Sequence, residues 1–232
     1  MRSPASAPGF RKLAASLCLA LGGLGVAAAP AAATTIDYSL TDYVGSGTPS
    51  IPSPYGTVAL DDNGGPNVSV TVSLASGVGF VNTGAGYVLT WDLSGGPTIS
   101  VTGLTSGFAL VSSSAGSSSA SASGSWDYAI TCDTSTCGHG GNSPYTGSLS
   151  FTIDSVGLAD FVANGSGNDF SADVCLGVSA GTCSGGITGV AVATTSSISG
   201  NSVPEPASIA IFAAALGSLA AFRRRRRWGE HN

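Results

Sequence analysis

The stretch NVSVTVSL, residues 67–74, decides the fold class, because it alternates apolar and small hydroxyl side chains with a period of two. Successive side chains of a β-strand point to opposite sides, so this alternation is typical of a strand with one buried face. GYVLTWDL (86–93) repeats it around Trp91, and SWDYAIT (125–131) places Trp126, Tyr128 and Ile130 on one face. The three stretches predict an all-β domain.

Five more stretches have strand-like composition: TISV (98–101), GFALV (107–111), LSFTI (149–153), FSADVCLGV (170–178) and ITGVAVAT (187–194). Clusters of Gly, Asn, Ser, Asp and Pro separate the strands at intervals of roughly 8 to 15 residues, which is typical of an antiparallel β-sandwich. We therefore expect one β-sandwich over residues 34–202, with a single helical turn near residues 155–165. The serine-rich segment 112–125 is expected to form an exposed loop.

Charge is distributed very unevenly along the 232 residues, of which 43% are hydrophobic and 9% charged. No Lys or Arg lies between residues 13 and 222, whereas this interval holds eleven aspartates and one glutamate. Such an acidic surface repels phosphate groups and has no guanidinium or ammonium group to bind them. The sequence therefore argues against nucleic acid as a partner and leaves dissolved cations as the natural counter-charge.

Residues 1–33 have the three parts of a secretory signal peptide. Arg2, Arg11 and Lys12 form a basic region, an apolar run covers residues 13–29, and small residues lead to a cleavage site expected after Ala33. The alternative is an uncleaved membrane anchor, but glycines interrupt the apolar run. We expect export through the Sec translocon and removal of this segment by signal peptidase.

The C-terminal stretch VPEPASIAIFAAALGSLAAFRRRRRW, residues 203–228, combines a proline motif, an apolar run and a basic cluster. Residues 207–222 would span roughly 24 Å as a helix, which is enough for a single transmembrane helix if its flanks contribute. The arginines of the cluster should remain cytoplasmic, which places the body on the outer side of the membrane. They are Arg223, Arg224, Arg225, Arg226 and Arg227.

This order of Pro204-Glu205-Pro206, short apolar helix and arginine cluster resembles the PEP-CTERM sorting signal of Gram-negative bacteria. The resemblance implies recognition by an exosortase, a membrane-embedded transpeptidase-like enzyme, with processing near the Pro-Glu-Pro motif. It also implies a transient inner-membrane anchor followed by delivery to the cell surface or extracellular matrix, in bacteria that make exopolysaccharide and biofilm. The alternative is a plain C-terminal anchor in which the motif is accidental.

Four cysteines remain after removal of the signal peptide, and an even number in an exported protein indicates disulfides. Three pairings can be drawn, of which the sequence-local one is the simplest: Cys132 with Cys137 and Cys175 with Cys183. A zinc site at Cys132, Cys137 and His139 is the alternative. Its spacing matches no usual C-x2-C arrangement, and the compartment is oxidising.

Catalytic residues are scarce, because His139 is the one histidine of the body. A hydrolase would need it in a Ser-His-Asp triad, yet the sequence has no G-x-S-x-G elbow. Asp61 and Asp62 are adjacent and should point apart in an extended segment, which does not suit a glycosidase pair. We therefore expect a protein that is not an enzyme.

Calcium is the one candidate cofactor, since Asp, Asn and carbonyl oxygens are its preferred ligands. One candidate set is Asp61, Asp62 and Asn63, and the other consists of Asn164, Asn168, Asp169 and Asp173. Turn formation explains the same residue types without a metal.

Trp91 and Trp126 lie on strand faces with other apolar residues, which favours a core position. A carbohydrate-binding module, the alternative function, would need one of them, or Tyr55 or Tyr145, exposed for stacking on a sugar ring. Residue patterns and resemblance together predict an exported structural or adhesive protein, with exopolysaccharide as a candidate partner. A secreted hydrolase is the third alternative.

Overall fold

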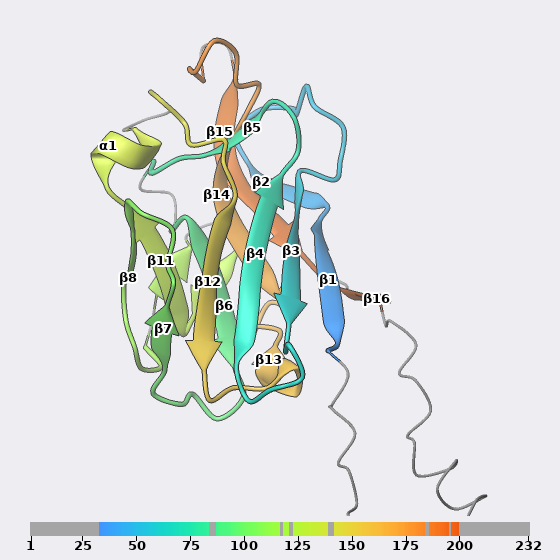
Figure 1. Cartoon of the computed structure of the whole chain (residues 1–232). Coiled ribbons are helices and arrows are strands. Elements are labelled where there is room, and N and C mark those ends of the chain that lie inside the picture. Colours follow the sequence, from blue (N-terminus) through green and yellow to red (C-terminus); the bar gives the residue numbers. More distant parts are fainter. Residues whose placement is uncertain are drawn as a thin grey trace, which may run out of the picture. The chain divides into compact units, whose positions relative to one another are not determined.

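The computed structural model describes residues 33–83, 87–116, 118–120, 123–138, 142–183, 186–194 and 196–199. Residues 1–32 of the predicted signal peptide (1–33) and the predicted transmembrane helix 207–222 lie outside these residues. Within the described residues, no helix is long and apolar enough to cross a membrane. The regular secondary structure of the described residues is almost entirely β-strand, and most of it forms two large antiparallel sheets with a shared core (Figure 1).

The first sheet has six strands in the order β16-β1-β3-β4-β12-β7, and every neighbouring pair is antiparallel. Its strands are β16 (Ser196–Ser199), β1 (Thr35–Leu40), β3 (Gly56–Asp61), β4 (Val68–Leu74), β12 (Leu149–Asp154) and β7 (Ser100–Thr102). On β4, Val68, Val70 and Val72 are buried, whereas Thr71 and Ser73 are exposed. This confirms the alternation on which the all-β prediction depends.

The second sheet contains the path β2-β15-β14-β6-β11-β8, with β5 pairing to β14 and β13 pairing to β6. Its strands are β2 (Asp42–Gly45), β15 (Ile187–Ala193), β14 (Phe170–Leu176), β6 (Leu89–Leu93), β11 (Tyr128–Cys132), β8 (Phe108–Leu110), β5 (Val78–Phe80) and β13 (Phe161–Val162). All seven residues of β14 are buried, as expected for a strand covered on both faces.

Aromatic side chains from the two sheets meet in the core. The Trp91 ring of β6 lies 5.5 Å from the Phe151 ring of β12, and the Tyr38 ring of β1 lies 4.9 Å from the Phe170 ring of β14. Contacts of this kind bury large apolar areas between sheets, which is the main source of stability in a sandwich. The sandwich prediction therefore agrees with the packing of the described residues.

The serine-rich segment differs from the expected loop. It contains a two-stranded hairpin of β9 (Ser118–Ala120) and β10 (Gly124–Trp126), and Ser123 is buried. The Ser123 hydroxyl accepts a hydrogen bond from the Trp126 indole N–H at 3.3 Å. A small hydroxyl side chain can therefore lie in the interior beside an indole. Trp126 belongs to this hairpin rather than to the strand of Tyr128 and Ile130, so the prediction of one continuous strand was wrong there.

Two short helical turns complete the fold. The α1 turn (Thr134–Cys137) follows β11, and the η1 turn (Leu158–Asp160) is a 3-10 turn within the segment where one helical turn was expected. The α1 turn lies at one end of the sheets, and β13 lies at the other end (Figure 1).

Candidate functional site

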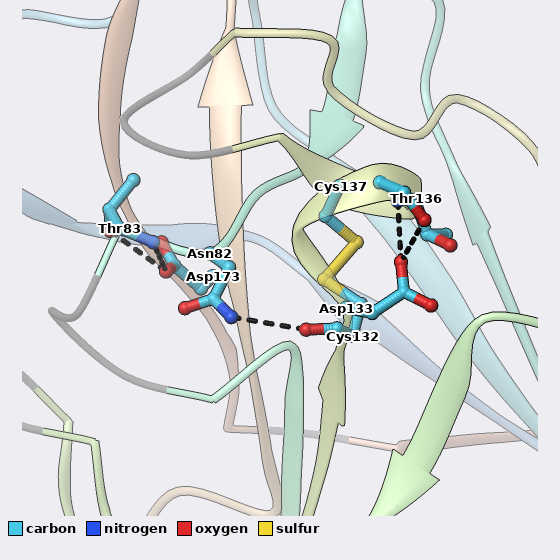
Figure 2. Close-up of a disulfide and its surroundings, with 8 residues drawn as sticks. Asn82, Thr83, Cys132, Asp133, Thr136, Cys137 and Asp173 are labelled. Atoms are coloured by element: carbon cyan, nitrogen blue, oxygen red, sulfur yellow. Dashed lines mark hydrogen bonds between the residues drawn. A yellow bond between two sulfur atoms is a disulfide. The ribbon is translucent and has the colours of Figure 1, made fainter.

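Asp173 is a fully buried aspartate in the middle of β14. Its carboxylate accepts hydrogen bonds from the Thr83 backbone N–H at 3.0 Å and from the Thr83 hydroxyl at 2.8 Å (Figure 2). Its backbone bonds to both sides of the same segment, because the Val81 N–H donates to the Asp173 carbonyl and the Asp173 N–H donates to the Tyr87 carbonyl. One residue thus holds the chain between β5 and β6 at three points.

The topology of the second sheet explains this arrangement. β5 and β6 pair with successive parts of β14, with Phe80 opposite Val174 and Thr90 opposite Ser171. The chain leaves the ladder between them, and the backbone bonds of Asp173 to Val81 and Tyr87 continue the pairing across the gap. The Asp173 carboxylate then accepts a hydrogen bond from the Thr83 backbone N–H, which lies in the segment that leaves the ladder.

Burial raises the pKa of Asp173 to about 6, although the backbone and hydroxyl hydrogen bonds from Thr83 act in the opposite direction. Removal from water disfavours the charged carboxylate more than two hydrogen bonds stabilise it. Burial also raises the pKa of Tyr43, and the Asp173 charge adds to this shift. Asp173 can therefore take up or release a proton near pH 6.

The Cys132–Cys137 disulfide lies close to this aspartate (Figure 2). The Asn82 side-chain amide donates a hydrogen bond to the Cys132 carbonyl at 3.1 Å, which joins the segment held by Asp173 to the disulfide. Asp133 caps α1, since its carboxylate accepts from the Thr136 N–H at 2.7 Å and from the Ser135 hydroxyl at 2.7 Å. These bonds hold the pKa of Asp133 below its usual range.

The second disulfide joins Cys175 of β14 to Cys183. The sequence-local pairing is therefore confirmed for both pairs. Because the sulfurs of Cys132 and Cys137 are bonded to each other as a disulfide, neither is a free thiolate that could ligate zinc, as the alternative interpretation requires. His139, which that reading and the hydrolase reading both need, lies outside the described residues.

The first candidate calcium set forms the turn between β3 and β4. The Asp61 carboxylate accepts from the Asn63 N–H at 2.7 Å, and the Asp62 carboxylate accepts from the N–H groups of Thr34 and Gly64 at 2.8 and 2.9 Å. These backbone bonds lower the pKa of Asp62. Turn chemistry thus accounts for one oxygen of each carboxylate, and calcium binding here stays a prediction.

The second candidate calcium set is divided between two places. The Asn164 side-chain oxygen accepts from the N–H groups of Ser166 and Asn168, and both asparagines donate to the Ser123 carbonyl. Asp173 faces Thr83 instead. No group of three or more His, Cys, Asp or Glu side chains in the described part of the chain is arranged to hold a metal ion.

The aromatic residues considered for sugar stacking are mostly in the interior. Trp91, Trp126 and Tyr55 are 0%, 1% and 6% exposed, and Trp91 stacks on Tyr128 with ring centroids 5.8 Å apart. The Trp91 indole N–H is buried and has no hydrogen-bond partner. Tyr145 is partly exposed but contacts Phe80 and Phe108.

The chain leaves the domain through β16, whose last residue Ser199 pairs with Thr35 of β1. A family model, described as the PEP-CTERM protein-sorting motif, matches residues 202–227. The chain is a PEP-CTERM sorting domain-containing protein. The match covers both Pro204-Glu205-Pro206 and Arg223–Arg227, so the resemblance seen in the sequence is confirmed. No curated protein and no solved structure matches this chain.

The motif implies that this PEP-CTERM protein is exported, processed by an exosortase and delivered to the cell surface. The interaction of Asp173 with Thr83 was not predicted, because the two residues are 90 positions apart. One signal was nevertheless present in the sequence. An aspartate within the otherwise apolar and small-residue run FSADVCL must find hydrogen bonds if the strand is buried.

Proposed function

We propose that this PEP-CTERM protein is a structural or adhesive component of the cell surface or extracellular matrix. Residues 207–222 anchor it transiently in the inner membrane, with Arg223–Arg227 on the cytoplasmic side, until the exosortase acts near Pro204-Glu205-Pro206. The observation that carries the proposal is the sorting motif, whose match begins three residues after the last described strand ends at Ser199. The motif thus follows almost directly on a folded domain, which is the part delivered.

A role without catalysis is supported by the chemistry around the buried carboxyl group. Asp173 contacts a hydroxyl and a backbone N–H of Thr83, and these bonds hold the segment between β5 and β6 in place. A glycosidase needs two carboxyl groups about 5 to 10 Å apart on either side of a substrate. Full burial of Asp173 and its three bonds to one segment instead favour a structural role.

Polysaccharide binding is the second candidate function, and Tyr145 is the aromatic residue through which it would act. Of the four aromatic residues considered, Tyr145 alone is not buried. Retention of the mature protein on host exopolysaccharide, lost on Tyr145→Ala and kept on Tyr87→Ala, would support this function over a purely structural one. Equal retention of both variants would argue against stacking on Tyr145.

The structural role is tested in the host by comparing the cohesion of the extracellular matrix in three strains. These are the wild type, a deletion strain, and the deletion strain carrying a chain in which Pro204, Glu205 and Pro206 are replaced by alanine. We expect lower cohesion in the second and third strains. Equal cohesion in all three would overturn the structural proposal, whereas full rescue by the alanine variant would show that sorting is not needed for the role.

A further inference from the structure

Both ends of the folded domain lie at the same end of the sandwich. In the six-stranded sheet, Thr35 at the start of β1 is opposite Ser199 on one side and Asp61 on the other. We call this the terminal end; it includes the β3–β4 turn and the end of β12 at Asp154. Ser94, which follows β6, also lies here, because its N–H donates to the carbonyl of Asp160 in the segment that follows β12.

The disulfides lie at the opposite end, which we call the disulfide end. β11 runs away from the terminal end, from Tyr128 opposite Trp91 to Cys132, and α1 follows. β14 runs the same way, from Phe170 to Cys175 and Leu176. The start of β12 at Leu149 belongs to this end too. Figure 1 shows α1 and the loop before β15 at the end of the sheets opposite to β13.

The chain between the domain and the sorting motif is short. Pro204 follows Ser199 by five residues, so the two lie at most about 18 Å apart even when this segment is fully extended. β4 has seven residues, and the distance between the two ends of the sheet is therefore about 20 Å. The disulfide end thus starts farther from Ser199 than the sorting motif can reach.

The pairing of β16 with β1 keeps the connection short. Four residue pairs join the strands, from Tyr38 with Ser196 to Thr35 with Ser199. Without this pairing the connection would begin at Ala193, the end of β15, and would contain eleven residues up to Pro204. Its reach would then be at most about 40 Å, and either end of the domain could approach the membrane.

We infer that the anchored protein is presented with its terminal end toward the membrane and its disulfide end outward, and that the β1–β16 pairing fixes this orientation. The inference rests on the proposed anchoring by residues 207–222. It leaves the loops that the two disulfides close facing away from the membrane.

The orientation is measured with two matched serine-to-cysteine variants of the full chain. Ser94→Cys places a thiol at the terminal end and Ser148→Cys places one at the disulfide end, and both serines are exposed. The four native cysteines of the mature domain are paired, so a fluorescent maleimide reacts with the new thiol. Each variant is produced in a host strain that lacks the exosortase, and spheroplasts are stained with a lipid-soluble energy acceptor.

We expect stronger energy transfer from position 94 than from position 148. Adding Ser197→Pro to each variant removes a ladder bond of β16, because Ser197 is opposite Asp37, whose backbone groups face β16. It should shrink the difference, because the connection lengthens. Equal transfer from both positions in membrane-bound protein, or stronger transfer from position 148, would overturn the inference alone. Labelled protein that washes off the membranes would overturn the anchoring proposal together with it.

Discussion

Replacing Asp173 by asparagine should make the mature domain more stable at neutral pH, although it alters a buried hydrogen-bonded residue. Asparagine has the same shape as aspartate. Its side-chain oxygen can still accept the Thr83 N–H bond, and its amide nitrogen, in place of the other carboxylate oxygen 3.1 Å from the Thr83 hydroxyl, can donate to that hydroxyl. The variant therefore keeps the segment between β5 and β6 in place. It differs from the wild type in having no charge to bury.

The expected magnitude follows from the pKa of Asp173, which is about 6 in the folded domain. An aspartate in an unfolded chain has a pKa of about 3.9, and a difference of roughly two units corresponds to about 3 kcal/mol. The folded state binds the proton more tightly, so the free energy of unfolding rises as pH falls from about 7 to about 4. Above pH 7 the ionised carboxylate lowers the stability of the wild type by the full amount.

The assay is equilibrium unfolding in urea, followed by tryptophan fluorescence from pH 4 to pH 8. We expect Asp173→Asn to exceed the wild type by about 3 kcal/mol at pH 8 and to match it within about 0.5 kcal/mol at pH 4. Asp42→Asn, an exposed position on β2, is the control, because it removes the same charge from the surface of an acidic domain. A constant difference between Asp173→Asn and the wild type across this range would refute the reasoning.

Three other changes test the packing of the domain. Trp91→Phe should change the free energy of unfolding in urea by less than about 1 kcal/mol, because the loss of an unpaired buried N–H offsets the loss of the larger ring. Trp126→Phe also loses the hydrogen bond to Ser123 and should lower the free energy of unfolding in urea by about 2 kcal/mol. Replacing both Cys132 and Cys137 by alanine should cost about 2 kcal/mol, because the loop they close is short, and an unchanged midpoint would contradict this. Asn164→Ala should cost about 2 to 3 kcal/mol, measured by thermal unfolding, because it leaves buried partners unsatisfied; a cost like that of an exposed serine-to-alanine change would contradict it.

Alternation was enough to predict the strands whose two faces differ. β4 and β12 expose Ser and Thr on one face and bury Val, Leu, Phe or Ile on the other, so their sequences specify them locally. β1 and β3 were not predicted, although Tyr38, Leu40, Val58 and Leu60 are buried at alternate positions. Their acidic and small residues weakened the pattern, and burial in these strands is decided by packing against Phe170 and other residues far along the chain.

The sorting motif could be recognised from the sequence because its parts are consecutive, and the disulfides because each pair closes a short loop. The buried aspartate could not be placed, because its partner Thr83 comes from a segment 90 residues away. The pairing of β16 with β1 joins residues about 160 positions apart and likewise depends on the whole topology. The orientation proposed for the anchored protein depends on this long-range pairing.

The central claim is that an exosortase processes this chain near Pro204-Glu205-Pro206 and that the domain is then delivered outside the cell. The intact mass of the mature protein, taken from the wild-type host and from a strain lacking the exosortase, tests it most directly. We predict a surface or medium species that begins near Thr34 and ends near Pro206 in the wild type alone. A membrane-held species that keeps its complete C-terminal tail in both strains would contradict the claim.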